Sequence, residues 1–230
     1  MSQARLKIDI LTLFPNLFEG PLNESMMKQA KNRGRVEIKI HNLRDYAQDK
    51  RKTCDDKPFG GGAGMVMMVG PIHDCLNKIG GKGWRILVSP RGTVFSHEQA
   101  KKLSKKRHLI FICGHYEGVD ERVHDHLIDE EISVGDFVTT GGEFPALCLI
   151  DAIVRLVPGV LGNEASLDSE SFSQGSLDYP QYTKPRKFQD WAVPNVLFSG
   201  NHRMIGSWRK KRAFEITQAM RPDLIKKTES

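Results

Sequence analysis

The 230-residue sequence predicts an α/β protein in which a mainly parallel sheet carries helices on both faces. Apolar runs with strand spacing alternate with helical patterns over residues 6–156, and this alternation is typical of parallel sheets. Glycine clusters follow two of the runs, at 114–118 and 135–142. Because glycine lets the backbone approach a ligand closely, we expect a small molecule to bind at the carboxyl edge of the sheet.

The first 79 residues contain two predicted strands and two predicted helices. The apolar run 6–13 indicates a buried strand, and alternation of apolar and polar residues indicates another at 36–43. Helical apolar spacing connects them over 17–30. A polar loop over 44–64 then leads to a helix over 65–79.

The next part alternates in the same way and completes the predicted sheet. Ser96 is suited to cap a helix, with Glu98 in its first turn. The predicted strands of this part are 84–90, 109–113 and 131–134, and the predicted helices are 96–106, 120–127 and 144–156.

Charge separates the end of the chain from the rest. Residues 183–230 hold eleven Lys and Arg and four Asp and Glu, a net charge of +7, whereas residues 1–182 have a net charge of −1. This basic region has helical spacing over 201–220, so a folded module that binds a polyanion is favoured over a solvated tail. We expect a sheet domain at 1–161, a flexible linker at 162–185 and a small basic helical domain at 186–230.

Composition excludes several classes of protein. No apolar run reaches the roughly 18 residues of a membrane span, and the first residues lack a secretory pattern. The four cysteines are widely spaced, which predicts reduced thiols, no metal site and a cytoplasmic location. The cluster 60–64 lacks the Gly-Lys-Ser/Thr ending of a phosphate loop, and a dinucleotide fingerprint is missing after the first strand.

Strings of residues along nearly the whole chain resemble the bacterial tRNA (guanine-N1)-methyltransferases of the TrmD family. These enzymes belong to the SPOUT class, whose core contains a trefoil knot. The strings that carry the resemblance are LTLFP at 11–15, DDKPFGGGAGM at 55–65, SPRG at 89–92, CGHYEGVDER at 113–122, SVGDFVTTGGE at 133–143, PGVLG at 158–162 and LFSGNH at 197–202.

The resemblance implies that S-adenosylmethionine binds within a knot at the carboxyl edge of the sheet. It also implies a homodimer whose active site combines the knot of one subunit with the second domain of the other. The residues that it assigns to the cofactor are Leu87, Val88, Pro90, Gly114, Glu117, Ser133, Val134, Gly135, Asp136, Phe137, Val138, Thr139, Gly141, Gly142 and Pro145.

The reaction implied is methylation of N1 of guanosine 37, just 3′ of the anticodon of tRNA. Because guanine N1 carries a proton at neutral pH, a carboxylate base is expected. The family has Asp directly before Ser-Phe, but this chain has Glu170, so Glu170 is the expected base and Asp168 the alternative. Arg155 is expected to stabilise charge developing on the guanine.

The basic region is expected to bind tRNA phosphates. Two alternatives remain open, namely a cofactor-sensing RNA-binding protein without catalysis and a knotted methyltransferase for another RNA position. The sequence also leaves a requirement for Mg²⁺ open. The residues assigned to RNA are Lys184, Arg203, Arg209, Lys210 and Arg212.

Overall fold

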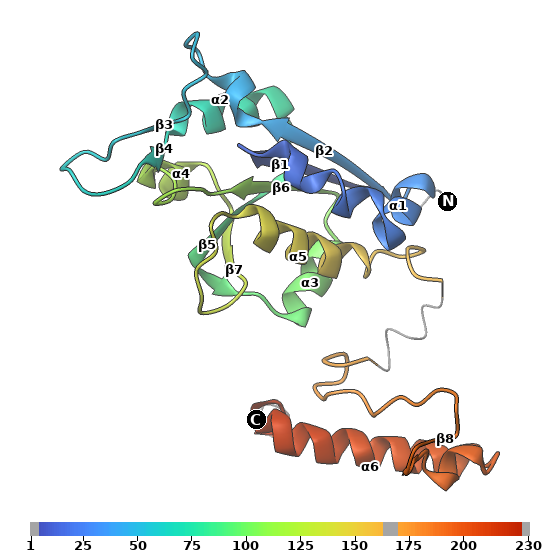
Figure 1. Ribbon diagram of the computed structural model, residues 1–230. Coiled ribbons are helices and arrows are strands. Elements are labelled where there is room, and N and C mark those ends of the chain that lie inside the picture. Colours follow the sequence, from blue (N-terminus) through green and yellow to red (C-terminus); the bar gives the residue numbers. More distant parts are fainter. Residues whose placement is uncertain (1–4, 163–169, 227–230) are drawn as a thin grey trace. The chain divides into compact units, whose positions relative to one another are not determined.

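The computed structural model describes residues 5–162 and 170–226, and the chain divides into two compact units, Met1–Gly162 and Asn163–Ser230. The first unit is built on a five-stranded sheet of order β2-β1-β6-β5-β7 in which each neighbouring pair is parallel (Figure 1). The predicted α/β class is therefore confirmed. The strands are β1 (Leu6–Thr12), β2 (Val36–Asn42), β5 (Trp84–Val94), β6 (His108–Cys113) and β7 (Glu130–Ser133).

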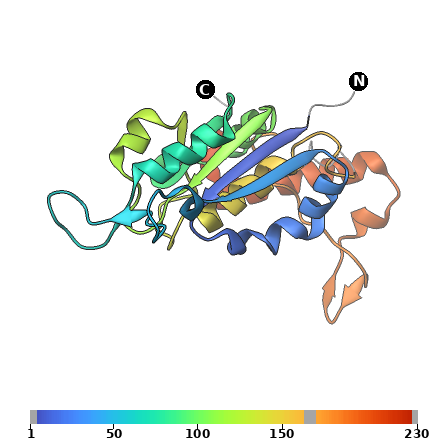
Figure 2. The same cartoon turned by 90° about the horizontal axis from the view of Figure 1, so that it is seen from above.

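Helices cover both faces of this sheet, seen from a second direction in Figure 2. One buried apolar cluster joins the sheet to α1, α3 and α5, and a second cluster joins the opposite face to α2 and α4. Strand β1 serves both, because Ile8 and Ile10 face the first cluster and Leu11 faces the second. The helices are α1 (Ser25–Asn32), α2 (Val69–Ile79), α3 (His97–Ser104), α4 (Glu121–His126) and α5 (Glu143–Val154).

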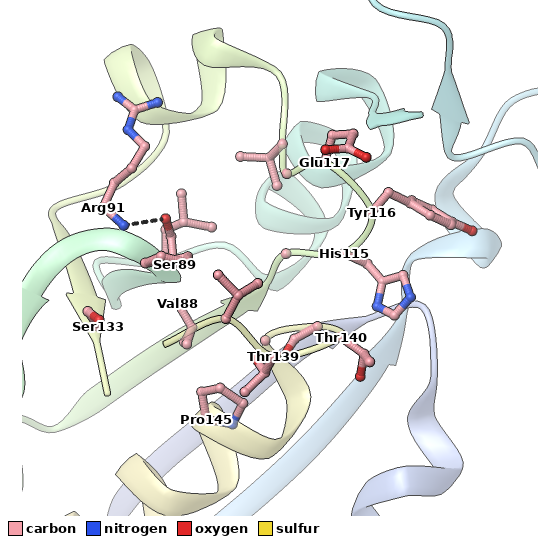
Figure 3. A pocket seen from close by; sticks show the side chains of 18 of the residues that line it. Val88, Ser89, Arg91, His115, Tyr116, Glu117, Ser133, Thr139, Thr140 and Pro145 are labelled. Carbon is pink, nitrogen blue, oxygen red and sulfur yellow. Dashed lines mark hydrogen bonds between the residues drawn. The ribbon is translucent and has the colours of Figure 1, made fainter. Parts of the chain in front are cut away.

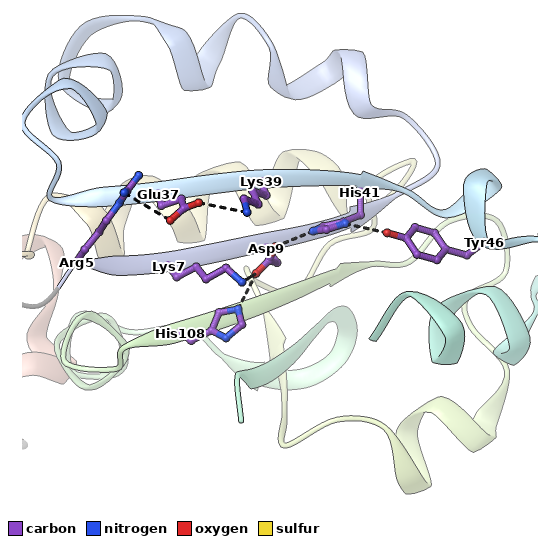
Figure 4. A network of polar contacts seen from close by, with 8 residues as sticks. All are labelled: Arg5, Lys7, Asp9, Glu37, Lys39, His41, Tyr46 and His108. Carbon is purple, nitrogen blue, oxygen red and sulfur yellow. Dashed lines mark hydrogen bonds and ion pairs between the residues drawn. The ribbon is translucent and has the colours of Figure 1, made fainter. Parts of the chain in front are cut away.

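A polar network interrupts the apolar run of β1 at Asp9, whose side chain is only 1% exposed (Figure 4). Its carboxylate accepts hydrogen bonds from Nε2 of His41 at 2.7 Å and Nε2 of His108 at 2.6 Å, and Nζ of Lys7 lies 3.0 Å away. Burial alone would raise the pKa of Asp9, but these three neighbours outweigh it and hold the pKa well below its usual value.

Two predicted helices differ from the structure. The helix expected over 17–30 is replaced by the 3-10 turns η1 (Pro15–Phe18) and η2 (Pro21–Asn23) followed by α1, because Pro21 lacks an N–H and disfavours helical backbone before it. The helix expected over 65–79 begins only at Val69. Its first residues form β4 (Val66–Met67) instead, which pairs antiparallel with β3 (Asp55–Asp56).

Strand β5 is longer than expected because it leaves the sheet and returns. Val88 and Thr93 both stand opposite Ile132 of β7, so residues 89–92 form an excursion between them. Gly92 closes this excursion, since a Cβ there would lie only 2.5 Å from the backbone carbon of Glu131. A glycine is therefore required for the strand to resume its pairing.

The second unit contains little buried surface. Among its described residues Thr217 alone is buried, and its hydroxyl accepts a hydrogen bond from the backbone N–H of Leu177 at 2.9 Å. This bond joins α6 to the segment that precedes it, and α6 matches the helix expected over 201–220. The elements of this unit are β8 (Lys187–Phe188), β9 (Trp191–Ala192), η5 (Asn195–Phe198), α6 (His202–Met220) and α7 (Pro222–Lys226).

Candidate functional site

A cavity of about 430 Å³ opens where β6 and β7 end and where β5 leaves the sheet after Val88 (Figure 3). The segments that leave these three strands form its walls, as the glycine clusters predicted. Its volume lies within the range of roughly 300–1,000 Å³ that is typical of small-molecule sites. The walls are formed by residues 87–91, 114–119, 133–134 and 137–142, together with Glu121, His124 and Pro145.

Backbone contacts hold two of these segments against each other. The N–H of Gly142 donates to the carbonyl of Gly114 at 2.7 Å. A Cβ on Gly142 would lie 2.9 Å from Cα of Cys113, so the end of β6 and the start of α5 touch through backbone. In the glycine cluster 135–142, Gly142 is therefore needed for packing, because only glycine permits two backbone segments to approach this closely.

A buried carboxylate directly follows Gly142 in the chain. Glu143, the first residue of α5, is 1% exposed, and its Oε1 accepts a hydrogen bond from the hydroxyl of Thr12 at 2.8 Å. Nδ1 of His115 lies 3.6 Å from its Oε2. Burial raises the pKa of the Cys113 thiol well above its usual value, and the nearby negative charge of Glu143 raises it further. Cys113 is therefore a neutral packing residue and not a nucleophile.

The segment after β6 contributes three polar side chains to the cavity, those of His115, Tyr116 and Glu117. Tyr116 adopts a left-handed backbone with φ of 59°, and its ring meets the His115 ring edge-on at 4.8 Å between centroids. This uncommon conformation of a non-glycine residue marks a constrained loop. The backbone N–H of Glu117 donates to the carbonyl of Met65 at 3.1 Å, which anchors the loop to the residue just after the first glycine cluster.

Hydroxyl groups fix the segment after β7. The hydroxyl of Ser133 donates to the carbonyl of Gly135 at 3.0 Å, and that of Thr139 donates to the carbonyl of Gly141 at 2.8 Å. Between them Phe137 and Val138 are 58% and 84% exposed. Exposed apolar side chains at the rim of a cavity are suited to cover an apolar ligand.

Thirteen of the fifteen residues predicted for the cofactor line this cavity, and Gly135 and Asp136 do not. That these fifteen residues bind a cofactor remains a prediction. Ser89 and Arg91 were missed as lining residues although the string at 89–92 stood out in the sequence, because the excursion of β5 that turns them toward the cavity has no sequence signature. The other lining residues not predicted for the cofactor are His115, Tyr116, Gly118, Val119, Glu121, His124 and Thr140.

The three predicted catalytic residues are divided between the two units, and their roles remain predictions. Arg155 directly follows α5 in the first unit and is half-buried, with its N–H bonded to the carbonyl of Asp151 at 3.2 Å. Glu170 belongs to the second unit, where its carbonyl accepts a hydrogen bond from the hydroxyl of Ser173 at 2.7 Å. Asp168 lies outside the described residues.

The residues predicted to bind RNA all belong to the second unit. Lys184, Arg203 and Lys210 are exposed. The guanidinium of Arg209 lies 4.7 Å from the ring centroid of Tyr179, whereas Arg212 forms an ion pair with Glu215 at 2.5 Å. Arg212 is thus the least available of the five for a phosphate.

Two kinds of feature are absent from residues 5–162 and 170–226. Within these described ranges, no group of three or more His, Cys, Asp or Glu side chains is arranged to hold a metal ion. Likewise, no helix in that part of the chain is long and apolar enough to cross a membrane.

Comparison with known proteins shows the family. The model of the family described as tRNA (Guanine-1)-methyltransferase TrmD matches residues 6–227. Similar curated proteins named tRNA (guanine-N(1)-)-methyltransferase occur in Dictyoglomus turgidum, which is 54% identical over 97% of this chain and 91% of the relative, and in Geotalea uraniireducens, which is 52% identical over 96% and 90%. A third, from Carboxydothermus hydrogenoformans, is 53% identical over 96% and 88%.

The parallel sheet, the cavity at its carboxyl edge and these relatives together define an enzyme of the methyltransferase class. The chain belongs to the tRNA (guanine-1)-methyltransferase family TrmD. The resemblance drawn from the sequence strings is thereby confirmed. Membership of a methyltransferase family implies a methyl donor, and the cavity at the carboxyl edge is large enough for a small molecule.

Proposed function

We propose that the protein transfers a methyl group from S-adenosylmethionine to N1 of guanosine 37 of tRNA. The observation that carries this proposal is the cavity of about 430 Å³ at the carboxyl edge of the sheet, lined by thirteen residues that the family resemblance assigns to the cofactor. Family membership supports the reaction on guanine N1, and the position within the tRNA extends it.

The walls of the cavity suit the chemistry of S-adenosylmethionine. Leu87, Val88 and Pro145 form an apolar surface against which an adenine can pack. The carboxylate of Glu117 offers a partner for the positive charges of the cofactor. When bound there, S-adenosylmethionine would supply an activated methyl group, and the protein would contribute alignment with the guanine.

A carboxylate in the second unit would remove the proton from guanine N1. We assign it to Glu170, with Asp168 as the alternative, because each can act as a general base close to Ser-Phe in the sequence. Arg155, next to the last turn of α5, is assigned to stabilise the negative charge that develops on the guanine as the proton leaves.

Assembly and RNA binding complete the proposal. In a homodimer, Glu170 of one subunit would serve the cavity of its partner, and a knot at the carboxyl edge would shape that cavity. The basic residues of the 186–230 domain, with Lys184 from the linker, would bind tRNA phosphates in the cytoplasm. Salt should then weaken tRNA binding steeply.

Methyl transfer from labelled S-adenosylmethionine to tRNA with guanosine at position 37 tests this function. The wild-type protein should methylate this tRNA and leave a transcript with adenosine at that position unmethylated. Labelling of a different nucleotide would establish the alternative of another RNA position. Cofactor binding without methylation of any RNA would establish the sensor alternative instead.

Two isosteric variants test the base. Glu170→Gln should lower kcat by about 10²-fold or more, since general-base catalysis contributes roughly 10²–10⁴-fold. Asp168→Asn is the matched control, because it removes a carboxylate two residues away and should retain most activity. If only Asp168→Asn abolishes methylation, Asp168 is the base and the assignment of Glu170 is wrong.

A further inference from the structure

A second cavity, of about 400 Å³, lies at the opposite edge of the same sheet. It is built by the segments that enter β5, β6 and β7, whereas the first cavity is built by the segments that leave them. Trp84 and His108, the first residues of β5 and β6, belong to its walls. The proposed methyl transfer does not use this cavity. The lining residues are Gly81, Lys82, Gly83, Trp84, Arg85, Lys106, Arg107, His108 and Asp129.

The walls carry a strong excess of positive charge. Four cations, those of Lys82, Arg85, Lys106 and Arg107, face a single carboxylate, that of Asp129. That carboxylate is already engaged, because its Oδ2 accepts the backbone N–H of Arg85 at 2.8 Å. Like charges gathered around one hollow repel one another, and an anion placed among them relieves this repulsion.

Three of these cations have no partner among the described residues. Within that part of the chain, the side chains of Lys82, Arg85 and Arg107 form neither a hydrogen bond nor an ion pair, and Lys82 and Arg107 are exposed. Arg91, another exposed arginine of this unit, is by contrast paired with Glu121 at 2.8 Å. The charges at the second cavity are therefore free to bind a ligand.

Two further side chains of the cavity are held in place. The indole N–H of Trp84 donates to Glu130 at 2.9 Å, and its ring supports Lys106, whose Nζ lies 3.6 Å from the ring centroid. His108 is fixed from below by the buried Asp9, which accepts a hydrogen bond from its Nε2 at 2.6 Å (Figure 4). Such second contacts orient binding groups before a ligand arrives.

The absence of a side chain at Gly83 keeps His108 accessible. A Cβ at this position would lie 2.8 Å from Nδ1 of His108 and 2.6 Å from a methyl of Ile110. The ring nitrogen that does not face Asp9 therefore points toward another wall residue of the cavity.

From this arrangement we propose that the second cavity is a binding site for phosphate groups. Arginine forks and lysine ammonium groups are the side chains that proteins use for phosphate, and several cations together suit a multivalent anion. The phosphate has two possible sources, the backbone of an RNA or a small phosphorylated compound. The proposal does not depend on methyl transfer.

Charge reversal at the two exposed cations tests the site with little risk to folding. Lys82→Glu/Arg107→Glu is compared with the wild-type protein and with Lys28→Glu/Lys102→Glu, a control with the same change in net charge at exposed residues outside the cavity. The affinity of each protein for inorganic pyrophosphate is measured by isothermal titration calorimetry. It should be about tenfold lower or more in the cavity variant, and unchanged in the control. Equal pyrophosphate binding by all three proteins would overturn the proposal.

The dependence of tRNA binding on salt separates the two sources. If RNA phosphates occupy the cavity, the cavity variant should make the negative slope of log K against log salt less steep, by about 0.9 for each phosphate that it no longer binds. The control variant should keep the wild-type slope. An unchanged slope together with abolished pyrophosphate binding assigns the site to a small phosphorylated compound. Because pyrophosphate is measured without RNA, failure of the tRNA methylation proposal would leave this test intact.

Discussion

Replacing Thr12 by Val should destabilise the first unit by about 2–4 kcal/mol. The hydroxyl of Thr12 donates to the buried carboxylate of Glu143 at 2.8 Å and accepts the backbone N–H of Phe14 at 2.9 Å. A hydrogen bond to a charged group contributes roughly 1.5–3 kcal/mol, and one between neutral groups roughly 0.5–1.5 kcal/mol. Val keeps the shape and branching of Thr, so the destabilisation reports the two hydrogen bonds and not a cavity.

Urea denaturation followed by circular dichroism measures this destabilisation. Thr93→Val is the matched control, because Thr93 is exposed on β5 and should change the free energy of unfolding by less than about 0.5 kcal/mol. A double-mutant cycle with Glu143→Gln should give a coupling energy of at least about 0.5 kcal/mol for the Thr12–Glu143 contact. If Thr12→Val behaves like the control, the buried carboxylate does not depend on Thr12 and the reasoning is wrong.

Three further predictions concern packing, acid and thiols. Gly142→Ala should cost about 1–3 kcal/mol in denaturation and weaken cofactor binding, because its Cβ would press on the backbone of β6, whereas Gly70→Ala, with open space around it, should be neutral or slightly stabilising. The pKa of Asp9 is lowered in the folded state, so its contribution to stability is complete above its unfolded pKa and is lost as the pH falls below about 4. The stability difference between wild type and Asp9→Asn should accordingly be larger at pH 7 than at pH 3, and a constant difference would contradict this. Ellman's reagent should label one thiol quickly in the native protein, because Cys148 is exposed while the other three cysteines are buried, and burial raises the pKa of each of those three thiols. Rapid labelling of two or more thiols would show that the core opens readily.

The sequence predicted the sheet well because its signals are local. The strands and most helices follow from apolar spacing, and the two later glycine clusters correctly marked the edge where the cavity lies. The helix expected over 17–30 failed because Pro21 interrupts an otherwise helical pattern. The pairing of β3 with β4 was missed because two-residue strands carry no periodicity.

The site was predicted less completely, for a different reason. Arg91 reaches the cavity through an excursion of β5, and the buried Glu143 is hydrogen-bonded by Thr12, which is 131 residues earlier in the chain. Contacts between distant residues leave no local pattern. For the same reason no sequence pattern pointed to the cavity at the amino edge, since Lys82, Lys106 and Asp129 meet only when three parallel strands align.

The strand order has a consequence for synthesis on the ribosome. The inner strand β1 pairs with β2 and with β6, which ends at Cys113. A nascent chain therefore cannot cover the second edge of β1 until about half of the protein has emerged, and this edge remains open to wrong partners until then. Translational pauses in the first hundred codons should thus lower the yield of folded protein more than pauses after residue 162.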